Sequence, residues 1–142
     1  MQELKDRIVK EGKVLPGNII KVDGFLNHRI DTELMDHIAE EFGKHFNMDE
    51  VTMILTAEAS GIALSAIVAQ HFHKPMIFAK KAKSDNIEGG LYQSDIFSYT
   101  YKKKVTLLVS KEWLSADDKV LIIDDFMANG EAMRGLCDIV NA

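Results

Sequence analysis

The sequence predicts a single α/β domain with a central, mainly parallel sheet flanked by helices. Compact apolar runs at 51–56, 75–79 and 119–123 have the length of buried strands, and a helical stretch at 62–72 separates the first two. This β-α-β order is typical of parallel strands joined by a covering helix. The chain has 142 residues, 46% of them hydrophobic, and no Pro/Gly/Ser linker or repeat. Residues 1–142 are therefore interpreted as one domain with its own core.

The first third of the chain predicts two helices separated by an irregular stretch. The first dozen residues place apolar side chains near helical spacing and reach Gly12, which predicts a short amphipathic helix with a glycine stop. The stretch 14–30 holds a proline and two glycines and is expected to form short extended pieces. Asp31 or Thr32 is expected to cap a second helix, whose apolar side chains recur on one face at Leu34, Ile38, Ala39 and Phe42.

The last third predicts a strand pair, a buried strand and a helix. The segments 91–101 and 105–110 are expected to be adjacent strands, with the lysine run 102–104 between them as an exposed hairpin or loop. In 119–123, four consecutive apolar residues lead directly into two acids. The segment 130–142 is expected to be helical, with its single cysteine, Cys137, as a small core residue.

Charge and composition exclude several classes of protein. Seventeen Lys and Arg residues against 22 Asp and Glu residues leave a net charge of −5, which disfavours general nucleic-acid binding. A lone cysteine forms no internal disulfide and favours the cytoplasm. No apolar run approaches the ~20 residues needed to cross a bilayer, so neither a signal peptide nor a membrane partner is expected. Two lysine clusters favour a small polyanionic ligand: Lys80, Lys81 and Lys83, and Lys102, Lys103 and Lys104.

The segment 120–132 carries the clearest chemical signal. A buried strand ends in Asp124 and Asp125, and a short loop of small residues leads into a helix. Ligands bind at the carboxyl ends of strands in open α/β sheets. The stretch 128–132 would offer backbone N–H groups to an anion at a helix N-terminus. Two acids beside a phosphate cradle suit a sugar phosphate, whereas the alternative is an acidic pair that only begins a solvated loop or caps a helix.

This segment, Val-Leu-Ile-Ile-Asp-Asp-Phe-Met-Ala-Asn-Gly-Glu-Ala, resembles the phosphoribosyl pyrophosphate (PRPP) signature of the type I phosphoribosyltransferases, and its wording is most similar to that of the xanthine-specific members. The resemblance covers nearly the whole chain. Residues 21–31 resemble the base-binding segment, and residues 56–61, Thr-Ala-Glu-Ala-Ser-Gly, resemble the pyrophosphate loop. Residues 79–81 resemble a basic strand end, and residues 98–103 resemble the flexible loop that closes over the reacting centre.

The resemblance implies a set of roles for residues of this chain. It implies that Asp124 and Asp125 position the ribose and that Lys102 shields the leaving pyrophosphate. For the purine it implies Ile20 and Asn27. The remaining PRPP-binding residues that it implies are Ala128, Asn129, Gly130, Glu131 and Ala132 for the 5′-phosphate, and Glu58, Ala59, Ser60, Gly61 and Lys81 for the pyrophosphate. Mg²⁺ is expected to arrive with PRPP near the two acids, with no direct protein ligand assigned.

The family also implies an activity and an architecture. We expect transfer of the 5-phosphoribosyl group from PRPP to a purine, xanthine first, which gives XMP and pyrophosphate in purine salvage. Residues 1–30 are expected to form an N-terminal helix and a hood over the strand ends, with 31–142 as the core. The resemblance also implies a homodimer. No general acid or base is assigned.

Two departures from the family pattern bear on these expectations. Ala132 replaces the Thr or Ser whose hydroxyl binds phosphate in many members, so backbone donors must suffice. The family continues beyond the point where this sequence ends, with a basic residue for the purine pocket, so a C-terminal truncation is expected. Three alternatives stay open: a PRPP-sensing regulatory domain without catalysis, an inactive fragment, and an enzyme for guanine or hypoxanthine.

Overall fold

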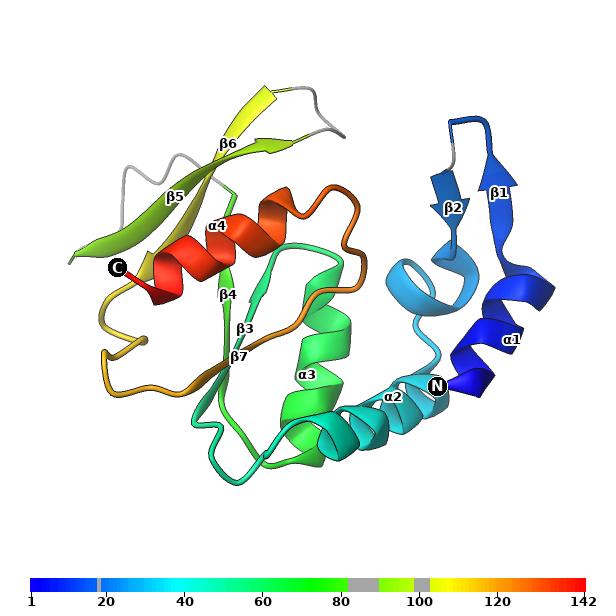
Figure 1. Cartoon of the computed structure of the whole chain (residues 1–142), viewed down its shortest axis with the longest axis horizontal. Coiled ribbons are helices and arrows are strands. Elements are labelled where there is room, and N and C mark those ends of the chain that lie inside the picture. The colour runs from blue at the N-terminus through cyan, green and yellow to red at the C-terminus, as the bar shows by residue number, and fades with distance from the viewer. Residues whose placement is uncertain (18, 82–89, 99–102) are drawn as a thin grey trace.

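The computed structural model describes residues 1–17, 19–81, 90–98 and 103–142 and confirms the predicted α/β class (Figure 1). A short π-helix, η1, follows the first two strands. In chain order the elements are α1 (Gln2–Glu11), β1 (Lys13–Leu15), β2 (Ile19–Lys21), η1 (Asp23–Asn27), α2 (Thr32–His45), β3 (Met53–Ala57), α3 (Gly61–His71), β4 (Met76–Ala79), β5 (Leu91–Ser98), β6 (Lys103–Ser110), β7 (Val120–Ile122) and α4 (Glu131–Val140).

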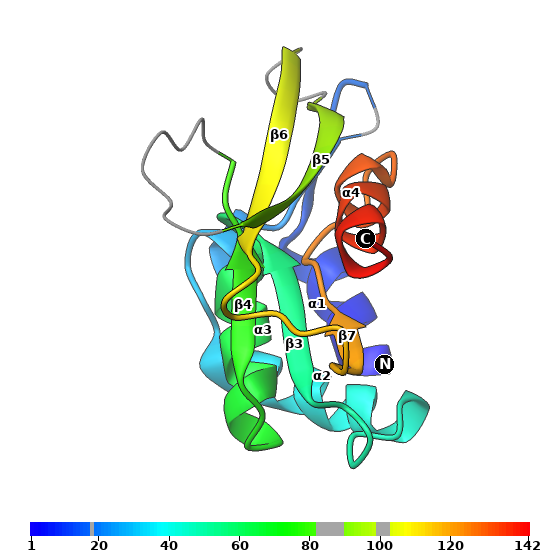
Figure 2. The same cartoon turned by 90° about the vertical axis from the view of Figure 1, so that its left-hand side faces the viewer.

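The central sheet is parallel and has the order β4-β3-β7. In its register Leu55 pairs with Ile77 on one side and with Ile122 on the other. Successive side chains of β3 point to opposite faces, so Ile54 joins one apolar cluster and Leu55 joins the other. Helices α2 and α3 cover the first face, while α4 and the β5–β6 hairpin cover the second (Figure 2). Burial on both faces explains why these strands are continuous apolar runs in the sequence.

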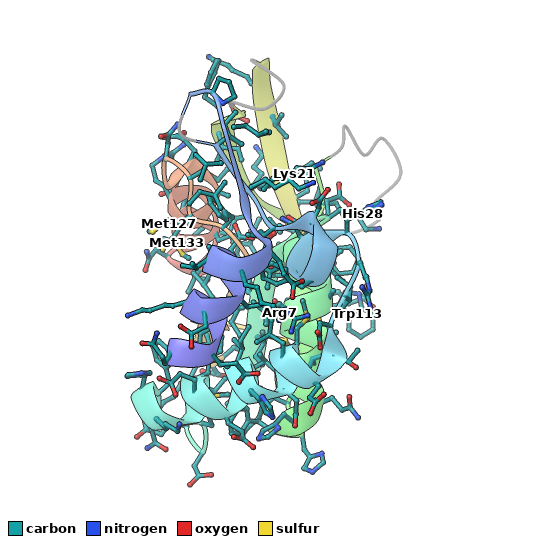
Figure 3. The ribbon with its side chains drawn as sticks, turned by 90° about the vertical axis from the view of Figure 1, so that its right-hand side faces the viewer. Arg7, Lys21, His28, Trp113, Met127 and Met133 are labelled. Carbon is teal, nitrogen blue, oxygen red and sulfur yellow. The ribbon has the colours of Figure 1, made fainter. Side chains whose placement is uncertain are left out.

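The N-terminal segment packs beside this sheet through α1 and η1. As predicted, α1 ends at Gly12, whose N–H donates to the carbonyl of Ile8. Asp31 caps α2, because its carboxylate accepts from the N–H of Leu34 at 3.2 Å. Arg7 donates to the same carboxylate at 2.7 Å and lies over the ring of Phe25 (Figure 3). Both helices are therefore held to η1.

The predicted strand pair is present as the antiparallel hairpin β5–β6. Its register runs from Leu91 opposite Ser110 to Ser98 opposite Lys103. A bridge between Lys80 and Leu108 joins the hairpin to the end of β4. The strand β6 starts earlier than predicted, because Lys103 and Lys104 pair with β5 instead of belonging to a loop.

One core prediction is wrong. Cys137 is exposed, since the buried face of α4 carries Gly135, Leu136 and Ile139, and each helical position turns about 100° from the last. Helix α4 lies close to the hairpin at Gly135, where a Cβ would come within 2.4 Å of Ile96 Cγ2. Within the described residues, no helix is long and apolar enough to span a membrane.

Candidate active site

A cleft of about 280 Å³ opens at the carboxyl ends of β3 and β7, where a ligand site is expected in such a sheet. Its walls come from η1, the turn after β3, the end of β4, strand β5 and the loop that joins β7 to α4. The lining residues are Asn27, Ala57, Glu58, Ser60, Lys81, Ile96, Phe97, Asp124, Asp125, Phe126, Met127, Ala128, Asn129, Glu131 and Ala132.

The two acids after β7 lie half-buried in this cleft. The backbone N–H of Asp125 donates to Asp124 Oδ1 at 3.0 Å, and the Asp125 carboxylate is near enough to act electrostatically on Asp124. Partial burial, followed by the neighbouring charge of Asp125, raises the pKa of Asp124 to about 6. The positive charge of Lys81 opposes this shift. The site therefore concentrates negative charge at a place where solvent stabilises it poorly.

Asp125 connects three segments that are far apart in the sequence. Asn27 Nδ2, from η1, donates to Asp125 Oδ2 at 3.0 Å. Ser60 Oγ, from the turn after β3, donates to Asp125 Oδ1 at 2.8 Å. The predicted base-binding segment, pyrophosphate loop and acidic pair thus meet at one carboxylate, whose orientation is set by two donors.

The turn between β3 and α3 closes tightly around Gly61. A Cβ at this position would lie 2.2 Å from Thr56 Oγ1 and 2.9 Å from Asp124 Oδ1, so only glycine fits. Thr56 Oγ1 is buried and has no hydrogen-bond partner among the described residues. The sequence places Thr56 at the start of the segment that resembles the pyrophosphate loop but gives it no role, and its side chain does not line the cleft. The same turn contains a cis peptide between Glu58 and Ala59, and the N–H of Lys81 donates to the Glu58 carboxylate.

The loop between β7 and α4 curls back on itself before the helix begins. Gly130 adopts a φ of 78°, a left-handed conformation that favours glycine, and its N–H donates to the carbonyl of Met127 at 2.7 Å. Ala128 also has a positive φ, of 42°. Met127 and Met133 together line a smaller hollow beside this loop (Figure 3). Glu131 and Ala132, in the first turn of α4, line the cleft, where the N–H groups at a helix start lack intrahelical partners.

The structure brings most, but not all, of the predicted site residues to the cleft wall. Ala59, Gly61 and Gly130 belong to its turns without lining it. Ile20 does not line it and lies on the exposed hairpin β1–β2. Lys102 lies outside the described residues. Two lining residues of β5, Ile96 and Phe97, were not predicted, because nothing in their local pattern distinguishes them from ordinary strand residues.

Asp124 and Asp125 offer adjacent carboxylate oxygens to a cation in the cleft, and Glu58 and Glu131 also line it. Within the described parts of the chain, no group of three or more His, Cys, Asp or Glu side chains is arranged to hold a metal ion. Mg²⁺ prefers oxygen ligands and commonly uses one or two carboxylates together with substrate phosphates. The pair Asp124 and Asp125 fits that second mode.

Comparison with known proteins decides the family. Residues 25–142 match the phosphoribosyl transferase domain. The chain belongs to the phosphoribosyltransferase family. This phosphoribosyltransferase is 54% identical to a xanthine phosphoribosyltransferase of Lachnoclostridium phytofermentans over 99% of the chain and 72% of the relative. It is 49% identical to a xanthine phosphoribosyltransferase of Clostridium novyi, over 99% of the chain and 74% of the relative.

Solved structures of lower identity share the fold of this phosphoribosyltransferase. APRTase from Giardia lamblia superimposes with a TM-score of 0.78 at 22% identity, over 97% of this chain and 76% of that one. Adenine phosphoribosyltransferase from Saccharomyces cerevisiae gives 0.76 at 16% identity, over 99% of this chain and 82% of that one. The predicted family and fold are thus both confirmed.

Proposed function

We propose that this phosphoribosyltransferase transfers the 5-phosphoribosyl group from PRPP to xanthine and releases pyrophosphate, as part of purine salvage. The observation that carries the choice of xanthine is the identity of 47–54% to curated xanthine phosphoribosyltransferases over nearly the whole chain. The half-buried acidic pair beside a helix N-terminus supports the phosphoribosyl part of the proposal.

The reaction exchanges one bond at ribose C1. The bond from C1 to the pyrophosphate oxygen breaks, and its electron pair leaves with pyrophosphate. A purine nitrogen forms the new bond to C1, and its proton passes to water. Positive charge develops on the ribose as the leaving group departs, so catalysis needs carboxylates near the sugar and donors or cations near the pyrophosphate.

In this proposal Asp124 and Asp125 accept hydrogen bonds from the ribose hydroxyls. With a pKa of about 6, Asp124 is mostly ionised at neutral pH. Partial burial supports the role, because charges interact more strongly with a developing cation where water is displaced. Asn27 and Ser60 set the orientation of Asp125 before substrate arrives.

The two anionic ends of PRPP have separate partners. The 5′-phosphate binds the backbone N–H groups of 128–132, which needs no hydroxyl at Ala132. The pyrophosphate binds the turn 58–61 together with Lys81, and Lys102 shields it as it leaves. The purine lies against Asn27 and the segment around Ile20.

Mg²⁺ is proposed to enter with PRPP, held by substrate oxygens next to Asp124 and Asp125. When bound, it supplies positive charge that stabilises the leaving pyrophosphate. The acidic pair fits this use because it offers carboxylate oxygens without a full protein-only coordination sphere. A homodimer and a cytoplasmic location are retained as further proposals from the family resemblance and the single cysteine.

The proposal is tested by incubating the 142-residue chain with PRPP, Mg²⁺ and one of xanthine, guanine, hypoxanthine or adenine, and by following nucleotide formation by chromatography. We expect turnover to be fastest with xanthine and to be abolished in Asp124→Asn and Asp125→Asn. Fastest turnover with another purine would overturn the choice of base. If calorimetry shows PRPP binding but no turnover occurs, the chain is a PRPP sensor instead of an enzyme. The absence of both binding and turnover would refute the assignment of the site.

A further inference from the structure

Three polar residues of α4 form a stripe that faces strand β5: Glu131, Arg134 and Asp138. Arg134 Nη2 donates to the backbone carbonyl of Asp95 at 2.7 Å, and Arg134 Nη1 donates to Asp138 Oδ2 at 2.7 Å. Glu131 Oε2 accepts from the N–H of Phe97 at 3.3 Å. We call these three residues the α4 stripe.

The contacts of the α4 stripe satisfy the strand edge that β6 does not cover. β5 pairs with β6 along one edge, and alternate residues direct their backbone groups to the other. The carbonyl of Asp95 and the N–H of Phe97 both point to that second edge, where α4 lies (Figure 1). The spacing of the stripe, three and then four residues, places its members on one helical face. Among the described residues, side chains of α4 thus bind two backbone groups of β5 in the way that a neighbouring strand would.

Arg134 is the centre of this arrangement. Its guanidinium contacts the strand carbonyl and both acids of the α4 stripe, with Glu131 Oε2 at 3.3 Å from Nη2. Asp138 also accepts from Ser94 Oγ, a buried hydroxyl of β5, at 2.8 Å. A planar guanidinium donates in several directions at fixed angles, which a lysine ammonium does not reproduce.

The α4 stripe joins two walls of the substrate cleft. Ile96 and Phe97 of β5 line one wall, and Glu131 and Ala132 of α4 line the other. The carboxylate of Glu131 is turned toward β5 and Arg134, so its negative charge is held by donors while the backbone of the first helical turn faces the cleft. This arrangement favours phosphate binding at the first turn of α4, because a Glu131 carboxylate without these donors would repel the anion.

We propose that Arg134 is a positioning residue that holds the β5–β6 hairpin against α4 and so sets the width of the cleft for PRPP. The inference rests on the proposed function, in which the first turn of α4 binds the 5′-phosphate. Arg134 does not line the cleft and acts through Glu131 and β5. Its effect should therefore fall on PRPP binding more than on the turnover of bound substrate.

The test compares Arg134→Met and Arg134→Lys with the unaltered chain in steady-state assays. We expect Arg134→Met to raise the KM for PRPP at least about fivefold, as expected when a substrate-holding group is misplaced, with a smaller change in kcat and in the KM for xanthine. Arg134→Lys keeps the positive charge but loses the planar guanidinium with its several donors. Its KM for PRPP should lie between those of Arg134→Met and the unaltered chain. The matched control is Lys44→Met, which breaks an exposed ion pair with Glu41 on α2, away from the cleft.

A second readout does not depend on activity. Hydrogen exchange of peptides covering 91–98, measured without ligand, should become faster in Arg134→Met and stay unchanged in Lys44→Met, because the removed contact restrains the β5 edge. Unchanged exchange in Arg134→Met would overturn the restraint. An unchanged KM for PRPP, or an equal rise in Lys44→Met, would overturn the positioning role. If the unaltered chain does not turn over, the proposed function fails, and the exchange result alone decides whether the restraint exists.

Discussion

Replacing Asp124 by Asn is expected to stabilise the ligand-free protein while abolishing its activity. The substitution keeps the shape of the side chain and an oxygen that accepts from the N–H of Asp125 at 3.0 Å. It removes a negative charge that is half-buried next to another carboxylate. The folded state therefore no longer has to hold an ionised group where the surroundings favour the neutral form.

The size of this effect follows from the pKa of Asp124, which rises from an ordinary value near 3.8 to about 6 in the folded state. Two units correspond to about 3 kcal/mol, and partial exposure with solvent screening reduces this to about 2 kcal/mol. Because this pKa is raised in the folded state, ionised Asp124 lowers the free energy of unfolding. This loss of stability is absent below pH 3.8, grows between pH 3.8 and 6, and is complete above pH 6. The gain should thus be full at pH 8 and shrink toward zero at pH 4.

Thermal unfolding of both proteins at pH 4 and pH 8, without PRPP or Mg²⁺, measures this gain. At pH 8 the Tm of Asp124→Asn should be about 6 °C higher than that of the unaltered chain. Asp125→Asn is the comparison variant, because both oxygens of the Asp125 carboxylate accept a hydrogen bond. The new amide NH₂ would face one of these donors, either Asn27 Nδ2 or Ser60 Oγ. A gain of equal size at both pH values, or no gain at pH 8, would refute the reasoning.

Three further outcomes follow from the same contacts. PRPP affinity, measured by calorimetry with Mg²⁺, should fall between pH 7 and pH 5 as Asp124 takes up a proton. The fall should be smaller in Asp124→Asn, and an equal dependence of affinity on pH in both proteins would contradict the role of Asp124 in PRPP binding. Gly61→Ala should lower both Tm and turnover, because its Cβ would collide with Thr56 Oγ1; unchanged turnover would show that the turn adapts. Asp31→Ala should cost about 1 kcal/mol in urea unfolding through the lost cap of α2, and more if its contact with Arg7 contributes; no loss would mean that the cap is dispensable.

The sequence was most informative where one local pattern served one structural need. The parallel strands are buried on both faces, so they stand out as apolar runs, and the acids after β7 mark the point where burial ends. The cap at Asp31 was equally local, because its partner, Leu34, is three residues away. These features needed no knowledge of distant contacts.

The parts that sequence reasoning missed depend on which elements meet in space. Ile96 and Phe97 line the cleft because the hairpin β5–β6 packs on α4, and close contact at Gly135 is not visible in either segment alone. The early start of β6 has the same origin, since pairing with β5 extends the strand through Lys103 and Lys104. The exposure of Cys137 follows from the angle at which α4 lies on its neighbours.

The transfer itself is tested most directly by ³¹P nuclear magnetic resonance of the chain mixed with PRPP, Mg²⁺ and xanthine. Our account predicts that the PRPP signals decline while those of pyrophosphate and of the XMP 5′-phosphate grow in a one-to-one ratio. When xanthine is omitted, none of these signals should change at the rate seen with xanthine. Persistent PRPP signals, or pyrophosphate released without a matching nucleotide, would contradict it.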